Sequence, residues 1–168
     1  PKRVKFVYGQ LSDNDIEKKK KKINELKEYA AQFKRTPQPI SKLKVGLKCG
    51  GSDGYSGLSA NPLVGMFSDS LISQGGSTAL TEVPEMFGAE RLLMNRCIDV
   101  DIFNKTVDLI NNFKRYFQKY DQVIYDNPSP GNKEGGITTL EDKSLGCIQK
   151  GGSARIVDVL DYGDPMIK

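Results

Sequence analysis

The chain has 168 residues, of which 38% are hydrophobic, and this is enough for a compact domain with its own core. Its formal net charge is +4, and much of the excess lies in the lysine run 18–22, which lacks interleaved aromatic residues and favours a solvated helix face over a nucleic-acid interface. No apolar stretch reaches the length of a membrane span, about 20 residues, and the first residues lack a signal-peptide core, so a cytoplasmic protein without a membrane partner is expected.

The composition also restricts thiol and imidazole chemistry. The three cysteines, Cys49, Cys97 and Cys147, are widely spaced, which argues against a disulfide framework and against a zinc knuckle. Reduced thiols are therefore expected. Histidine is absent, so a histidine base or an imidazole ligand would have to come from outside these residues.

The first half of the chain predicts a helix, a strand and a loop. Apolar residues at three- and four-residue steps predict an amphipathic helix over 13–33, with Ser12 or Asp13 as its cap. Alternating residues predict a strand over 43–47. Residues 49–57 follow it, and their four glycines exclude regular structure, so the strand should run into a loop.

The middle of the chain continues this alternation. Asn61-Pro62 is typical of a helix start, and the apolar pattern carries that helix to Gly75. Residues 78–83 read as the next strand. A long helical pattern then predicts a helix over 99–120.

The last third predicts a polar loop, a helix and a final strand. Residues 126–136 contain turn-forming residues and no apolar side chain, which predicts a loop throughout. A helix over 138–149 and a strand over 156–160 follow. Together the elements predict a single α/β domain, 1–168, with a mainly parallel sheet, helices on both faces and Rossmann-like layers. Ligands bind such sheets beyond the carboxyl ends of the strands, where both glycine-rich loops are expected.

The loop 49–57 does not have the spacing of a nucleotide site. It lacks both the G-x-x-x-x-G-K-[ST] and the G-x-G-x-x-G patterns. Its glycines would let backbone N–H groups approach an anion such as a substrate carboxylate, with Ser52, Asp53 and Ser56 adding oxygen contacts. An ordinary tight connection is the alternative.

Two ordered motifs resemble the signatures of the altronate and galactarate dehydratase family. The first comprises residues 45–53 (VGLKCGGSD), 55–57 and 60–62; the second comprises 127–133 (NPSPGNK), 135–136 and 141–146. The similarity extends over about 16–163, and residues 81–90 are most similar to the altronate branch. Many relatives carry a histidine where this chain has Arg91, so any chemical role of that histidine is not carried over.

The resemblance implies a hydro-lyase that converts D-altronate to 2-keto-3-deoxygluconate and water in hexuronate catabolism, with Fe²⁺ or Mn²⁺ as its metal. It also implies a C-terminal domain fragment, inactive alone, whose partners are the sugar acid and the remaining domains of the same enzyme, and which can form a homo-oligomer. Galactarate dehydratase and a sulfolactate sulfo-lyase subunit are alternatives within this resemblance. A non-enzymatic sugar-acid binding domain is an alternative of a different class.

Dehydration beside a carboxylate requires a base, an acid and stabilisation of the enediolate, and a divalent metal would provide the last. Cys49, at a strand end, is the softest ligand and suits ferrous iron, with Asp53 or Glu85 as the oxygen partner. A buried structural thiol is the alternative for Cys49. Cys97 and Cys147 are expected in the core.

The candidate acid and base groups follow a strand end. Glu82, Glu85 or Glu90 would act as the base if burial raised its pKa, with a solvated surface carboxylate as the alternative. Lys133 would be a base only if desolvated, and otherwise the cation that holds the substrate carboxylate.

The second loop offers polar groups for sugar hydroxyls. Asn127, Ser129 and Asn132 are suitable donors and acceptors, although these residue types are also common as turn formers. We expect this loop and the loop 49–57 to meet at one edge of the sheet and form part of the site.

Overall fold

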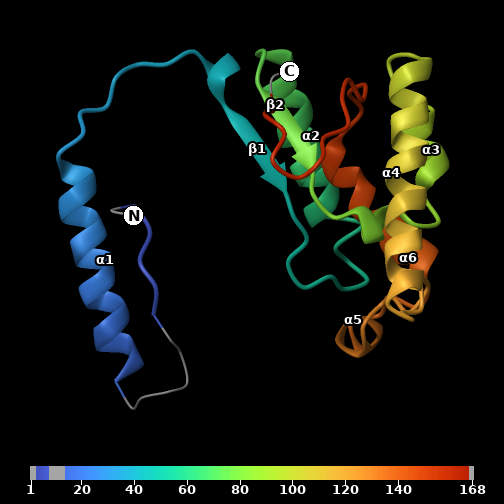
Figure 1. The fold of residues 1–168 in the computed structure, drawn as a ribbon, viewed down its shortest axis with the longest axis horizontal. Helices are drawn as coiled ribbons and strands as arrows, with labels where there is room; N and C mark the ends of the chain where they lie inside the picture. The colour runs from blue at the N-terminus through green and yellow to red at the C-terminus, as the bar shows by residue number, and fades with distance from the viewer. Residues whose placement is uncertain (1–2, 8–13, 167–168) are drawn as a thin grey trace. The chain divides into compact units, whose positions relative to one another are not determined.

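The computed structural model describes residues 3–7 and 14–166, which form two compact units, one within residues 1–38 and one within residues 39–168 (Figure 1). Each unit is described by itself. The expectation that the chain forms one domain stays a prediction. No helix in the described part of the chain is long and apolar enough to cross a membrane.

The first unit contains the helix α1 (Asp15–Ala31), which confirms the helix predicted over 13–33. The predicted caps Ser12 and Asp13 lie outside the described residues, and Asn14 stands at the N-cap without a side-chain hydrogen bond. The lysine run lies on this helix, and its Lys20 pairs with Glu17 at 2.8 Å. Such an exposed pair contributes little to stability.

The second unit is built on a short parallel sheet. The 3₁₀ helix η1 (Ile40–Lys42) leads into β1 (Lys44–Leu47), which pairs in parallel with β2 (Ser77–Leu80). The connection between the strands is α2 (Ala60–Ser73), as the sequence predicted. The strand predicted over 78–83 is wrong beyond Leu80. The 3₁₀ helix η2 (Val83–Met86) begins at Val83, and Pro84 in its first turn has no N–H to donate to a ladder.

Two helices follow η2 and contribute Leu93, Ile102 and Ile110 to the core. They are α3 (Glu90–Met94) and α4 (Val100–Lys119), and the latter confirms the helix predicted over 99–120. Asp99 caps α4 by accepting a hydrogen bond from the backbone N of Ile102 at 2.8 Å. Phe87, only 1% exposed, packs its ring edge-on against aromatic residues of α4.

The last part of the chain corrects two expectations. The segment predicted as loop contains the helix α5 (Pro130–Glu134), which Ser129 caps by accepting a hydrogen bond from the backbone N of Asn132. A capping residue followed by proline was the signal for it. The helix α6 (Leu140–Cys147) continues into the 3₁₀ helix η3 (Ile148–Gly151), which together cover most of the predicted 138–149.

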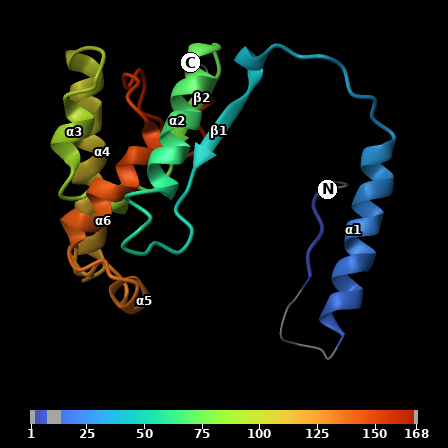
Figure 2. The same cartoon turned by 180° about the vertical axis from the view of Figure 1, so that it is seen from behind.

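The strand predicted over 156–160 is wrong. Ile156 makes only an isolated parallel bridge with Cys97. The fold is therefore a mixed α/β arrangement, mostly helical, with one two-stranded parallel sheet in the part of the chain that the structure describes. Rossmann-like layers with helices on both faces are not shown. Figure 2 shows α2 and α6 on the side of this unit that faces away in Figure 1.

Candidate active site

The two glycine-rich loops are in direct contact. The backbone N of Gly54 donates to the carbonyl of Gly135 at 2.7 Å, and the Asn132 side-chain amide donates to the carbonyl of Ser52 at 2.8 Å. The contact is close at Gly135, because an added Cβ would lie 3.1 Å from the Cβ of Asp53, tighter than most real Cβ contacts. Segments about 80 residues apart in sequence therefore form one surface.

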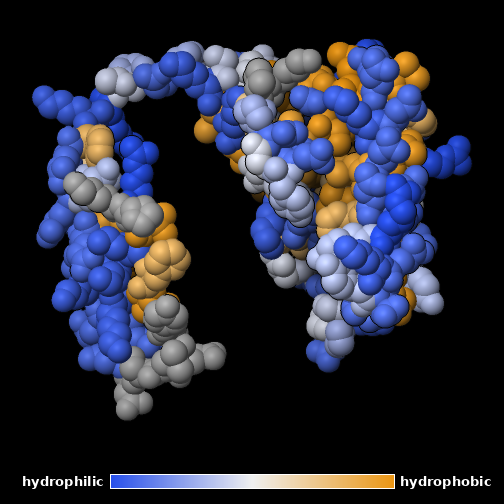
Figure 3. Space-filling model, in the orientation of Figure 1, coloured by the Kyte–Doolittle hydropathy of each residue, from blue (hydrophilic) through white to orange (hydrophobic). Residues whose placement is uncertain are grey.

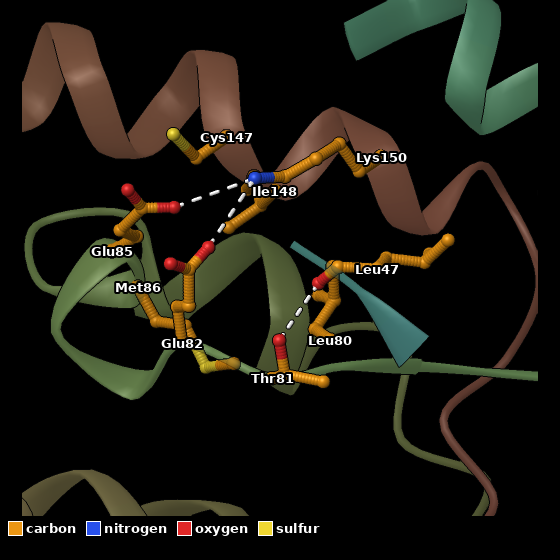
Figure 4. Close-up of a pocket in the computed structure, with 9 residues that line it drawn as sticks. All are labelled: Leu47, Leu80, Thr81, Glu82, Glu85, Met86, Cys147, Ile148 and Lys150. Atoms are coloured by element: carbon orange, nitrogen blue, oxygen red, sulfur yellow. Dashed lines mark hydrogen bonds and ion pairs between the residues drawn. The ribbon is translucent and has the colours of Figure 1, made fainter. Parts of the chain in front are cut away.

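A small pocket lies beyond the carboxyl ends of β1 and β2, where ligands bind to parallel sheets (Figure 4). One part of its wall is apolar and the other carries charge, and the lining residues are Leu47, Leu80, Thr81, Glu82, Glu85, Met86, Cys147, Ile148 and Lys150. The charged residues come from η2 and its N-cap on one side and from η3 on the other.

Lys150 is the cation at the centre of this pocket. Its side chain is 5% exposed, and Nζ lies 3.4 Å from a carboxylate oxygen of Glu85 and 3.8 Å from one of Glu82. Figure 4 shows the ammonium group between these two carboxylates. A second lysine, Lys143, approaches the other oxygen of Glu85 at 3.5 Å, so Glu85 lies between two ammonium groups.

The charges around Glu85 decide its ionisation. Burial alone would raise its pKa, but the positive charge of Lys150, hydrogen bonds to Cys147 and Glu82, and the charge of Lys143 together lower the pKa below its ordinary value. Glu85 is therefore a stable carboxylate near neutral pH. The condition set for a base, a pKa raised by burial, is not met at this residue.

A group suited to a metal ion adjoins the pocket. The Sγ atoms of Cys49 and Cys147 and a carboxylate oxygen of Glu85 all lie within 4.8 Å of one another. Burial, followed by the negative charge of Glu85, raises the pKa of the Cys147 thiol to about 12. Cys49 Sγ lies 2.6 Å from the hydroxyl of Ser52, and its backbone N donates to Glu82 at 2.6 Å.

A family model described as D-galactarate/Altronate dehydratase, C-terminal, matches residues 40–168. The chain belongs to this family. It is 60% identical over 163 residues to the altronate dehydratase of Bacillus subtilis (strain 168) and 57% identical over 164 residues to that of Escherichia coli (strain K12), covering 97% and 98% of this chain. The galactarate dehydratase (L-threo-forming) of Escherichia coli (strain K12) is 39% identical over 132 residues, which cover 79% of this chain and 25% of that protein.

The chain spans 33% of the length of each of the two altronate dehydratases. Within this dehydratase family segment, the geometry brings together some of the residues selected from the sequence and not others. Cys49, Glu82 and Glu85 meet at the pocket.

Asp53, selected as a metal ligand, has a different environment from Cys49. Its Oδ1 accepts hydrogen bonds from the backbone N of Tyr55 and from the backbone N and hydroxyl of Ser56, at 2.9–3.0 Å. The carboxylate of Asp53 thus stabilises the turn in which it lies. Among the described residues, it does not belong to the group of Cys49, Glu85 and Cys147 that is suited to a metal ion. Cys147 is buried, which confirms the expectation that it lies in the core, and its Sγ also belongs to that group.

The second loop is organised by Lys143. Its Nζ donates to the side-chain carbonyls of Asn127 and Asn132, each at 3.1 Å, and Ser129 also donates to Asn132 at 2.8 Å. Lys133, in contrast, is exposed on α5 and does not line the pocket.

Glu90 is also separate from the pocket. It pairs with Lys114 at 2.7 Å, and although burial favours the neutral acid, the hydrogen bond to Lys114 leaves its pKa lowered.

Sequence reasoning missed Lys143, Cys147 and Lys150. Their spacing of four and three residues was the available signal, because it places all three on one face of a helix. Lysine side chains on a helix are usually expected to be solvent-exposed. The side chains of Lys143 and Lys150 are instead nearly buried, at 11% and 5% exposure.

Proposed function

We propose that the longer polypeptide to which this chain belongs dehydrates D-altronate to 2-keto-3-deoxygluconate in the cytoplasm, and that the pocket around Lys150 is part of its active site. The observation that carries this proposal is the 60% and 57% identity to two altronate dehydratases, against 39% to a galactarate dehydratase. The remaining domains of the enzyme are the proposed partners of this segment.

The donor set fits a first-row divalent metal. Thiolate ligands suit iron, and a carboxylate oxygen suits either iron or manganese, so we assign Cys49, Cys147 and Glu85 to Fe²⁺ or Mn²⁺ with iron preferred. When bound, the metal would supply Lewis acidity that stabilises the enediolate. The raised pKa of Cys147 indicates that its thiol carries a proton without metal, so binding would release that proton.

The other groups of the pocket have separate proposed roles. Lys150 and Lys143 hold the substrate carboxylate, because they are the nearly buried cations beside the pocket. Glu82, at 26% side-chain exposure, is more accessible than Glu85 and takes the proton next to the carboxylate. The catalytic role predicted for Lys133 from the sequence stays a prediction.

The two loops supply the proposed contacts to the sugar hydroxyls. Ser52 lies beside Cys49, and Asn127 and Asn132 lie beside Lys143. Ser56 and Ser129 already donate hydrogen bonds within their own loops, so they orient neighbouring groups and contact substrate through their remaining lone pairs. Asp53 stays a proposed hydroxyl acceptor through the carboxylate oxygen that its turn does not use.

Substrate preference tests this proposal. The full-length protein, purified without oxygen and supplied with Fe²⁺, is expected to form a 2-keto-3-deoxy acid from D-altronate at least 100-fold more efficiently, as kcat/KM, than from galactarate. The selectivity is expected because the charged pocket binds one carboxylate of the substrate, while the polar groups of the two loops form hydrogen bonds to its hydroxyls.

Three competing results would each overturn the proposal. Preferred turnover of galactarate would make the protein a galactarate dehydratase, and sulfite release from sulfolactate would make it a sulfo-lyase. Tight binding of altronate without turnover, in the presence of metal, would favour a sugar-acid binding role.

A further inference from the structure

The inward side of the helix α2 consists of small and polar residues and one leucine, Leu71, whereas several of its large apolar residues point outward. The buried positions include Asn61, Gly65 and Ser68, whereas Leu63 and Met66 are 68% and 71% exposed. Phe67 is 47% exposed, and Leu58, just before the helix, is 78% exposed. We call Leu58, Leu63, Met66 and Phe67 the α2 face. It belongs to the helix on the near side of Figure 2.

The inward side of α2 is fixed by contacts that need small residues. An added Cβ at Gly65 would collide with the carbonyl oxygen of Gln149 in η3, so the two backbones touch. The hydroxyl of Ser68, fully buried, lies 2.7 Å from that of Thr78 in β2. Rotating the helix to bury the α2 face would break both contacts. The outward direction of Leu63 and Met66 is therefore a consequence of tight packing.

The α2 face carries no charge. Asp69 is the helix's single charged residue, and it accepts hydrogen bonds from the backbone and hydroxyl of Ser153 and from the backbone of Ala154. Leu63, Met66 and Phe67 stand in a stretch, residues 58–68, that contains no charged residue. Exposed large apolar side chains grouped in this way are typical of a surface that another protein segment covers. Figure 3 shows apolar surface on the opposite face of this unit as well, where it is flanked by hydrophilic residues.

The sheet beneath α2 also requires more protein. Parallel sheets occur almost only with both faces covered, and sheets usually contain four to six strands, whereas β1 and β2 form a pair of four-residue strands. The two altronate dehydratases are about three times as long as the region that they share with this chain. Polypeptide of the same molecule is thus available to cover this unit.

We propose that the α2 face is buried by an apolar segment of the same polypeptide that lies outside residues 1–168. This inference rests on the proposed function, since it takes the chain to be one part of a longer dehydratase. Intramolecular cover explains why Leu63, Met66 and Phe67 are large and uncharged on a helix whose inward side is already filled.

Photo-crosslinking of the full-length protein tests the proposal. Benzoylphenylalanine replaces Met66, and ¹⁴N- and ¹⁵N-labelled chains are mixed before refolding so that crosslinks within one chain are distinguished from those between copies. We expect most crosslinks to join position 66 to peptides of the same label outside residues 1–168. The same probe at Asp108, an exposed polar position of α4, is the matched control and should give at least tenfold fewer such crosslinks.

Each other outcome overturns the proposal. Crosslinks between differently labelled chains would identify a second copy as the occupant. Crosslinks to residues 1–38 would identify the first unit of this chain, and an absence of protein crosslinks would mean that the face is solvated. A companion measurement is maleimide labelling of Met66→Cys, which should be at least tenfold slower than labelling of Asp108→Cys.

The outcome is independent of the substrate assay. If the full-length protein fails to dehydrate altronate while position 66 crosslinks within its own chain, the proposed function fails and the α2 face assignment stands. If altronate is dehydrated and position 66 labels as fast as position 108, the α2 face assignment fails alone.

Discussion

Replacing Cys147 or Cys49 with serine is expected to lower the affinity for Fe²⁺ by at least 100-fold in the full-length protein, because each substitution removes one of the three atoms that we propose as metal ligands, which lie within 4.8 Å of one another. Serine keeps the size of the side chain but offers a hard, protonated hydroxyl in place of a thiolate. The measurement is bound iron after anaerobic dialysis against a competing chelator, with keto-acid formation as a second readout.

Cys97 provides the matched control for this prediction. It is half-buried, its Sγ lies 3.5 Å from the hydroxyl of Thr106, and it is outside the ligand group. Cys97→Ser should retain iron as the unmodified protein does. Equal iron content in all three variants, with far-ultraviolet circular dichroism unchanged, would remove the cysteines from the metal site.

Replacing Lys150 with methionine is expected to reduce kcat/KM for altronate by at least 100-fold and to lower the free energy of unfolding by about 3 kcal/mol. The reason is that Glu85 would keep only Lys143 as a neutralising partner in a nearly buried position. The measurements are keto-acid formation and urea unfolding. Lys133→Met is the matched control, because Lys133 is exposed on α5 and lies outside the pocket lining.

The pH dependence of the stability loss in Lys150→Met follows from the lowered pKa of Glu85. A carboxylate whose pKa is lower in the folded protein stabilises the fold above its ordinary pKa near 4.5, and this stabilisation is lost as the pH falls through the folded value. The stability difference between the unmodified protein and Lys150→Met should therefore be largest near neutral pH and shrink below about pH 4.

The activity comparison has its own contradicting outcome. A larger loss of activity in Lys133→Met than in Lys150→Met would assign the carboxylate-binding role to Lys133.

Local patterns predicted most of the helices and the first strand. The strand at 43–47 and the helix at 99–120 have clear apolar periods, and both appear within one or two residues of the predicted bounds. Residues 156–160 also have a strand-like pattern, but a strand exists only where a neighbour pairs with it, and Ile156 finds only a bridge to Cys97. Pairing of this kind depends on the tertiary structure, so alternation alone could not decide it.

The site was predictable only in part for a similar reason. The glycine-rich composition of both loops indicated that they form part of a site, and Cys49 and Glu85 do lie together. The pKa of Glu85 could not be inferred, because it depends on lysines that are 58 and 65 positions later in the chain. The residue type of Asp53 suggested a metal ligand, but its carboxylate accepts a hydrogen bond from the backbone N of Ser56 in its own turn.

Substrate protection of Cys49 tests most directly whether this pocket is the place where the sugar acid binds. In the metal-loaded full-length protein, the rate of alkylation of Cys49 is measured by mass spectrometry with and without D-altronate, and Cys97 in the same sample serves as the internal reference. We predict that saturating altronate slows alkylation of Cys49 at least tenfold and leaves Cys97 unchanged, because Cys49 adjoins the charged pocket whereas Cys97 lies outside it. An unchanged alkylation rate at Cys49, at an altronate concentration that saturates turnover, would contradict the assignment of this pocket to the active site.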